Sequence, residues 1–393
     1  DSTFKAGLQL TQFPLEERFA FGITGHVHVE EGSGLYPYTA EGGGQLWRFH
    51  GRATPTLASA FAQTDLHLGQ LFVAAGLRQD RWTAPGVSVS ELQPRLGISY
   101  TFGSHGPTLR ASADRLLITP DRENLALSSS AAAAALGADP DHGETGHVEP
   151  VRPEVQTSLS ASLEHQLGKW GRVLVEGWRK RGTNAADVEQ FLNTGIEFPI
   201  AFARGYAQGW NLRLDLVSQV GWSGYLSLGR TRAEVEGPMV GGLGLHLEHH
   251  EEEGEDHGHG GTGRMLIDHD QKLAGQIGVK YERNGTWALL QGRYDSGLVA
   301  GHPEDAEGDP DLEFGLKHVR WDAGDGVWRV EPRTTWDLST GHTFQLADRR
   351  RLELSASVMN LTDKRTLYNF LSHRGGTHVY PGRTVTLRVK VGF

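Results

Sequence analysis

Hydrophobic and polar side chains alternate strictly over the last ten positions of the chain. The apolar set falls at every second position from 385 to 393, and the intervening positions are mostly polar. Successive side chains of a β-strand point to opposite faces, so this period predicts a strand with one apolar and one polar face. The same alternation recurs at 4–10, 92–102, 155–167, 210–216, 273–281 and 352–358.

The length of these segments favours a membrane protein. They extend over about ten to twelve residues, whereas strands of globular proteins typically have about five or six. A tilted strand of about 9 to 11 residues crosses a bilayer. Only every second residue faces lipid, so such a protein has an unremarkable average hydropathy. A soluble β-sandwich or propeller would also alternate, but the strand length argues against it.

The connections between the predicted strands alternate between short and long. Outer-membrane barrels have short periplasmic turns and long extracellular loops. We therefore predict an all-β fold, a transmembrane antiparallel β-barrel of which about 15 strands are visible. The predicted short turns are 13–18, 68–71, 103–107, 167–172, 218–222, 284–285 and 341–349. The predicted long loops are 24–54, 83–90, 119–153, 182–204, 233–270, 297–327 and 363–381, and 131–135 is expected to form a short helix because alanine favours helices.

Composition supports the barrel and excludes other classes. The chain has 393 residues, 38% of them hydrophobic, and a formal net charge of -10. No stretch approaches the roughly 18 to 20 apolar residues of a membrane-spanning helix. The cationic residues form no basic stripe, so nucleic acid is not an expected partner. Cysteine is absent, which excludes disulfides and thiolate metal sites.

A histidine-rich segment in the loop 233–270 is the main candidate for binding chemistry. Imidazole with neighbouring carboxylates suits zinc, nickel or copper. The short spacings allow a flexible loop to chelate a metal, but they select no particular one. A solvated acidic loop explains the same residues, and no other cofactor is expected. The candidate ligands are His246, His249, His250, His257 and His259.

No motif indicates an enzyme. Gly258, Gly260 and Gly263 match the dinucleotide fingerprint, but no predicted strand precedes them and no helix follows. The segment 221–225 lacks the glycine spacing of a nucleophile elbow. We therefore expect that the protein is not an enzyme.

In the closing part of the chain a strand ends in Asn360-Leu361-Thr362-Asp363, a loop follows, and Pro381-Gly382-Arg383 leads into a last strand with an aromatic end. This order of segments resembles that of TonB-dependent receptors. The resemblance implies a barrel of about 22 strands, in the outer membrane of a Gram-negative-type bacterium. It also implies import of a scarce ligand, which could be a metal chelate, a cobalamin-like molecule, an oligosaccharide or a peptide. Further segments that carry the resemblance are 75–82, 93–100, 193–200 and 293–297.

The resemblance also bears on domains and partners. Receptors of this kind contain an N-terminal plug, through which a TonB-type complex supplies energy, and residues 1–393 contain no segment like it. Barrels of single chains have an even number of strands, whereas the count of predicted strands here is odd. The segment 4–10 is also predicted to run toward the periplasm. Together these two features suggest that the first strands are also absent. We thus interpret the chain as part of one barrel domain. Charges expected to face the lumen and contact the plug are Arg95, Arg110, Glu164, Arg213, Asp215, Lys280, Glu353 and Arg388.

The terminal strand is expected to guide insertion. In outer-membrane proteins a terminal aromatic strand helps the insertion machinery, and Val389, Val391 and Phe393 fit that role. Packing against outer-membrane lipid explains the same residues and is compatible with it. Two other functions stay open: a passive porin of about 16 strands, and a membrane-anchored enzyme or adhesin. The sequence does not identify the residues that bind the ligand.

Overall fold

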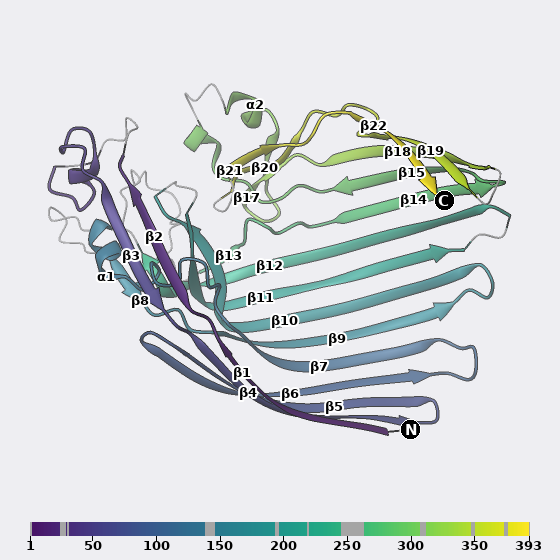
Figure 1. The fold of residues 1–393 in the computed structure, drawn as a ribbon, viewed down its shortest axis with the longest axis horizontal. Coiled ribbons are helices and arrows are strands. Elements are labelled where there is room, and N and C mark those ends of the chain that lie inside the picture. Colours follow the sequence, from purple (N-terminus) through teal and green to yellow (C-terminus); the bar gives the residue numbers. More distant parts are fainter. Residues whose placement is uncertain are drawn as a thin grey trace.

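The computed structural model consists of one large antiparallel β-sheet with smaller elements at one end (Figure 1). It describes residues 2–23, 29, 31–137, 146–192, 196–217, 220–244, 263–306, 312–346, 350–372 and 376–392. Within these ranges, no helix is long and apolar enough to span a membrane.

In the described residues, fourteen strands follow one another across the sheet in chain order, each antiparallel to its neighbours. They are β1 (Ser2–Gln12), β4 (Thr56–Leu68), β5 (Leu71–Ala84), β6 (Val87–Thr101), β7 (Thr108–Ile118), β9 (Glu154–Gln166), β10 (Gly171–Gln190), β11 (Glu197–Leu216), β12 (Trp222–Gly244), β14 (Ala274–Arg283), β15 (Thr286–Asp295), β18 (Arg333–Gln345), β19 (Arg351–Met359) and β22 (Thr384–Gly392). Two short strands, β8 (His147–Glu149) and β13 (Arg264–Leu266), pair with the far end of β12.

The remaining elements lie in the long connections. Three hairpins are formed by β2 (Leu15–Phe21) with β3 (Trp47–Ala53), β16 (Val319–Asp322) with β17 (Val327–Val330), and β20 (Leu367–Ser372) with β21 (Gly376–Val379). The short helices are α1 (Ala131–Ala134) and α2 (Glu313–Leu316), and the 3-10 turns are η1 (Tyr36–Tyr38), η2 (Ala135–Gly137) and η3 (Pro303–Ala306). The predicted alanine helix is confirmed as α1, and the Ser130 hydroxyl accepts a hydrogen bond from the backbone N–H of Ala133 at its start.

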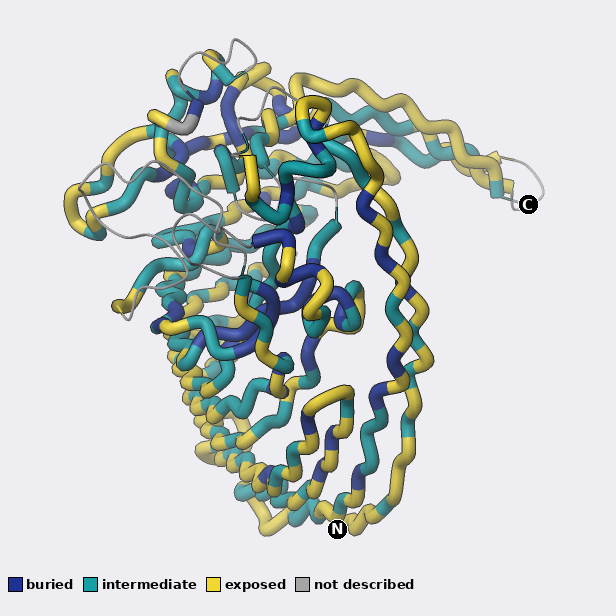
Figure 2. The backbone as a smooth tube through the Cα atoms, turned by 90° about the vertical axis from the view of Figure 1, so that its left-hand side faces the viewer, coloured by how far each residue is buried: buried dark blue, intermediate teal, exposed yellow. Residues whose placement is uncertain are grey.

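The register of the sheet separates an apolar face from a polar face. One row of directly opposed residues runs through Leu71, Tyr100, Leu109, Leu163, Val175, Leu212 and Leu228. Apolar side chains remain highly exposed on this face, with Leu8 87% and Leu387 78% exposed. An apolar surface of this extent is typical of contact with lipid. The sheet curves strongly when viewed from the end that bears the hairpins (Figure 2).

In the described part of the chain, the short turns other than the one between β5 and β6 lie at one end of the sheet, the turn end, and the long connections lie at the other, the loop end (Figure 1). Both labelled chain ends also lie at the turn end (Figure 1). The all-β barrel fold with short turns and long loops is therefore confirmed. The predicted direction of the first strand is wrong, because 13–18 is not a turn: β1 leads past Phe13 into β2 toward the loop end. With both ends on one side, parity gives no argument for absent strands.

Two predicted long loops are mostly strand. Residues 83–90 contain only the tight turn Pro85-Gly86, with Gly86 at a positive φ of 72°. Residues 182–190 and 197–204 form the outer parts of β10 and β11, which pair up to Gln190 and Glu197. Within the described part of the chain, β1 pairs only with β4 and β22 only with β19, so the ladder has two open edges.

The largest hydrophobic core lies at the loop end and not inside the sheet. Phe191, from the β10–β11 connection, is completely buried and contacts Phe19, Phe21 and Trp47 of the β2–β3 hairpin. The Glu17 carboxylate joins this hairpin to the segment before α1, since it accepts hydrogen bonds from the N–H groups of Ala126 and Leu127 at 2.9 Å each. The loops are thus packed against one another and give the loop end a defined surface.

Candidate functional site

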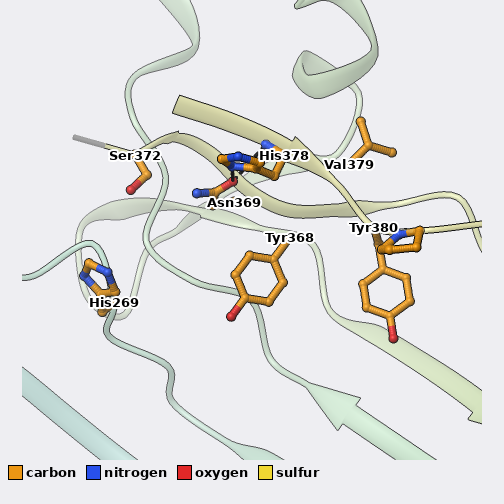
Figure 3. Close-up of a pocket in the computed structure, with 8 residues that line it drawn as sticks. His269, Tyr368, Asn369, Ser372, His378, Val379 and Tyr380 are labelled. Carbon is orange, nitrogen blue, oxygen red and sulfur yellow. Dashed lines mark hydrogen bonds between the residues drawn. The ribbon is translucent and has the colours of Figure 1, made fainter. Parts of the chain in front are cut away.

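A hollow of about 610 Å³ opens at the loop end beside the β20–β21 hairpin (Figure 3). Most of its wall comes from this hairpin and the residues after it, and one residue comes from the segment between β13 and β14. It combines apolar surface with a few polar groups, as small-molecule sites do. The lining residues are His269, Tyr368, Asn369, Ser372, His378, Val379, Tyr380 and Pro381.

Hydrogen bonds fix the polar groups of this hollow. The Asn369 side-chain oxygen accepts a hydrogen bond from the backbone N–H of His378 at 2.8 Å, and it lies 2.9 Å from Nδ1 of the same histidine. Ser372 donates its hydroxyl to Oδ2 of Asp268 at 2.5 Å. The other oxygen of Asp268 contacts Nδ1 of His269. The imidazole rings of His378 and His269 are therefore both held through Nδ1, by Asn369 and Asp268 respectively. The Nε2 atom of each ring is not used in these two contacts.

The two tyrosines are positioned by one arginine. The Arg333 guanidinium lies 4.8 Å from the Tyr368 ring centre and 4.9 Å from the Tyr380 ring centre. It also donates to Asp295 at 2.7 Å and to the carbonyl of Leu367 at 2.9 Å. Cation–π contacts of a buried arginine are energetically significant, and Arg333 is only 7% exposed. Its charge is balanced by Asp295, so the hollow presents no cationic side chain.

Carboxylates lie behind the hollow. Burial raises the pKa of Asp187, at the outer end of β10, and the nearby charge of Asp268 raises it further. His269 is also close enough to influence Asp187, in the opposite direction. The hollow is therefore backed by acidic groups, and its own lining is neutral when the imidazoles are neutral.

Asn360 joins the two segments that resemble TonB-dependent receptors. It is 2% exposed and adopts a positive φ of 50°. Its amide donates to the carbonyls of Lys364 and Pro381 at 3.0 Å each, and its side-chain oxygen accepts from the N–H of Lys364 at 2.9 Å. Pro381 lines the hollow and precedes β22. This asparagine thus sets the position of one wall of the site.

A buried ionic network anchors the base of the site. Arg329 of β17 is 1% exposed and donates to Asp270 at 2.7 Å, Asp322 at 3.1 Å and Asp325 at 2.9 Å. Lys272 contacts both Asp322 and Asp325, at 2.5 and 2.9 Å. Since Asp270 directly follows His269, this network fixes the segment that contributes His269 to the hollow.

The residues singled out from the sequence do not meet at this site. The five candidate metal ligands lie in 245–262, outside the described residues; they are His246, His249, His250, His257 and His259. Phe393 also lies outside the described residues. Val389 and Val391 lie on the apolar face of β22, 68% and 49% exposed. In the part of the chain that the structure describes, no group of three or more histidine, aspartate or glutamate side chains is arranged to hold a metal ion.

Several of the charges expected in the lumen lie on the polar face in ion pairs. Arg110 bonds Glu164 at 3.0 Å, and Asp215 accepts from Arg213 and Arg172. Lys280 donates to Glu282 at 2.5 Å. Their predicted contact with a plug stays a prediction.

The lining of the hollow was not predicted. Its residues come from segments about a hundred positions apart, and none of them forms a local motif. The only available signal was the position of 363–381 and 233–270 in long connections, because loops often carry binding residues.

Comparisons with solved structures show the fold. The ferric-catecholate import receptor Fiu from K12 E. coli matches 99% of this chain at 14% identity, with a TM-score of 0.61 over 51% of the receptor. The siderophore receptor PiuA from Acinetobacter baumannii matches 99% of this chain at 12% identity, with a TM-score of 0.62 over 52% of its length. The copper transporter OprC covers 88% of this chain at 15% identity, with a TM-score of 0.57 over 49% of its length.

The matched structures are longer than this chain. The chain spans about half the length of the solved structures that it matches. No curated protein matches the sequence. The sequence profile of the family described as "TonB dependent receptor-like, beta-barrel" matches residues 2–361. The chain therefore belongs to this family of outer-membrane β-barrels of Gram-negative bacteria.

Proposed function

We propose that the chain forms barrel strands and outer loops of a receptor that imports a scarce ligand across the outer membrane, and that the hollow beside β20–β21 contacts this ligand. The observation that carries the proposal is the hollow itself, which lies at the loop end and combines aromatic and hydrogen-bonding groups. Sites of this composition bind small molecules.

Among the ligand classes suggested by the sequence, the proposal favours a metal complex. The solved structures that are similar in fold to this chain include a ferric-catecholate import receptor, a siderophore receptor and a copper transporter. The hollow supplies aromatic and imidazole groups, and imidazole is a common ligand of transition metals, which favours a metal-containing ligand. Energy would come from a TonB-type complex acting through a plug. Family membership argues against the passive porin.

Uptake by the full-length receptor tests this function. Cells carrying the parent receptor would be supplied with a ferric catecholate, a copper(II) salt or cobalamin as the limiting nutrient. The variant His269→Ala with Tyr368→Ala removes two lining side chains. The matched control, His165→Ala with Tyr100→Ala, removes the same residue types near the turn end of β9 and β6.

Two outcomes separate the parts of the proposal. We expect the parent and the control to import one of the probes, and the variant to import it at least tenfold more slowly. Import at equal rates by the variant and the control would reject the hollow as the ligand contact. Failure of the parent to import any probe in an energy-dependent manner would reject the transport function for these ligand classes.

We further propose that the histidine-rich loop captures a transition metal before transport. The proposal rests on composition alone, because 245–262 lies outside the described residues. Zinc, nickel and copper would be titrated into the intact protein and into a variant with alanine at His246, His249, His250, His257 and His259. A control with alanine at His50, His67, His105, His147 and His165 keeps the number of histidines equal.

The expected result is loss of tight binding in the loop variant and not in the control. Binding should also weaken below about pH 6, because imidazole must be neutral to bind a metal. Equal millimolar binding by the parent and the loop variant would reject metal capture.

A further inference from the structure

The apolar face of the sheet ends in exposed arginines on two of the central strands. On β10 the residues of this face are Val173, Val175 and Gly177, followed toward the loop end by Arg179 and Arg181. On β12 they are Leu226 and Leu228, followed by Arg230. All three arginines are exposed. They stand at the outer boundary of the apolar belt, where hydrocarbon gives way to lipid headgroups.

The strand between them brings the arginines into one patch. On β11 the apolar side chains from Leu216 to Trp210 are followed by Gln208 and Tyr206. Arg179 lies directly opposite Gln208, and Arg230 lies directly opposite Trp210. Strands are about 4.8 Å apart, so Arg179 and Arg230 are separated by roughly 10 Å across the sheet. Their opposed partners on β11 are two residues apart, so the two arginines are also offset by about 7 Å along the strands, and Arg181 lies about 7 Å from Arg179 toward the loop end. We name Arg179, Arg181 and Arg230 the arginine patch.

The acidic residues near the arginine patch are already paired. Glu234 accepts from Arg232 at 2.8 Å. Glu236 bonds Arg204 and Arg264 at 3.1 Å each. Within the described residues, Arg179, Arg181 and Arg230 form no ion pair. The patch therefore carries three positive charges that the surrounding described side chains do not neutralise.

We propose that the arginine patch binds phosphate groups of anionic lipids in the outer leaflet. The guanidinium group presents paired donors that match phosphate oxygens. An apolar belt lies below the patch on the same face, so a lipid can place its acyl chains on Leu212, Leu228 and Val175 while its phosphate meets the arginines. Trp210 lies at the same boundary, where tryptophan is favoured. The proposal concerns the lipid face and is independent of the ligand hollow.

The test compares lipid binding by the full-length receptor purified in detergent. The probes are lipid A with two phosphates and the same lipid after removal of both phosphates, detected by native mass spectrometry. The variant is Arg179→Gln with Arg181→Gln and Arg230→Gln. The matched control, Arg95→Gln with Arg110→Gln and Arg388→Gln, removes three arginines from the polar face.

We expect the parent and the control to bind the phosphorylated lipid, and the variant to bind it roughly tenfold or more weakly, since each arginine near an anionic surface contributes measurably. Binding by the parent should weaken as salt rises and should be lost for the dephosphorylated lipid. Equal binding by the variant and the control would overturn the proposal. Equal binding of both lipids by the parent would also overturn it, since acyl contacts alone would then explain retention. Far-ultraviolet circular dichroism confirms that each variant keeps its β-sheet.

Discussion

The indole ring of Trp287 on β15 covers Gly341 on β18. The two residues are directly opposed in the antiparallel ladder, and a Cβ atom added to Gly341 would lie 2.8 Å from the indole Cε2. A ring can lie flat on the sheet here because the glycine has no side chain. The same relationship between opposed residues occurs at Gly7 with Phe61, Gly209 with Trp178, Gly278 with Tyr225 and Gly292 with Trp336.

Replacement of Gly341 by alanine should destabilise the barrel. The new methyl group would force the Trp287 ring off its position, and overpacking of this kind costs about 1 to 3 kcal/mol. Thermal unfolding in detergent, followed by circular dichroism, measures the effect. Gly177→Ala is the matched control, because nothing lies within 4 Å of its added Cβ. Trp287→Ala combined with Gly341→Ala should remove the clash, and a double variant as unstable as the sum of the single ones would contradict this account.

The alternation of apolar and polar side chains was sufficient to predict most strands of the barrel. The parts of the structure that it did not predict have physical reasons. Strands such as β22 have one face in lipid, so every second residue must be apolar and the pattern is strict. The outer parts of β10 and β11 extend beyond the apolar belt and pack against loops, so residues such as Asp187 and Arg204 carry no alternation. The hollow depends on contacts such as Ser372 with Asp268, 104 positions apart, which no local pattern encodes.

Asn360 should be needed for the connection between β19 and β22. Asn360→Ala removes three hydrogen bonds from a buried site and places alanine at a positive φ. Together these changes should cost about 2 to 4 kcal/mol. Asn284→Ala is the control, because Asn284 has a similar φ of 51° in a turn and lacks a comparable set of side-chain hydrogen bonds in the described structure. Equal losses of stability in the two variants would show that backbone strain alone accounts for the effect.

Arg329 should hold the β16–β17 hairpin against the base of the loops. Arg329→Met leaves the carboxylate of Asp270 buried without its partner, and breaking a buried ion pair in this way costs about 3 to 5 kcal/mol. Hydrogen exchange of 267–272 and of the hairpin should increase. Arg320→Met is the control, since Arg320 lies directly opposite Arg329 in the hairpin but is exposed. Unchanged exchange in Arg329→Met would contradict a structural role for the network.

Acid should loosen the same hairpin. Burial alone would raise the pKa of Asp325, but hydrogen bonds from Lys272, Arg232 and Arg329 hold it well below its ordinary value. A carboxylate with a lowered pKa stabilises the fold above its ordinary pKa, and this contribution is lost as the pH falls toward the lowered value. The protection of the β16–β17 turn against hydrogen exchange, measured relative to the intrinsic exchange rate at each pH, should therefore fall below about pH 4. Asp325→Asn should remove most of this pH dependence, and an unaltered profile would exclude Asp325 as its source.

The terminal strand allows a test that separates an insertion signal from simple packing against lipid. We propose that Val389, Val391 and Phe393 are recognised by the barrel-insertion machinery. Val389→Ser with Val391→Ser should slow assembly in cells severalfold more than Val385→Ser with Leu387→Ser, although both pairs remove two side chains from the apolar face of β22. Phe393→Ser should act like the first pair. Spontaneous folding into lipid vesicles, without the machinery, should slow equally in the two pairs, because both lose similar apolar area. Equal defects of the two pairs in cells would mean that lipid packing alone explains the apolar end of the chain.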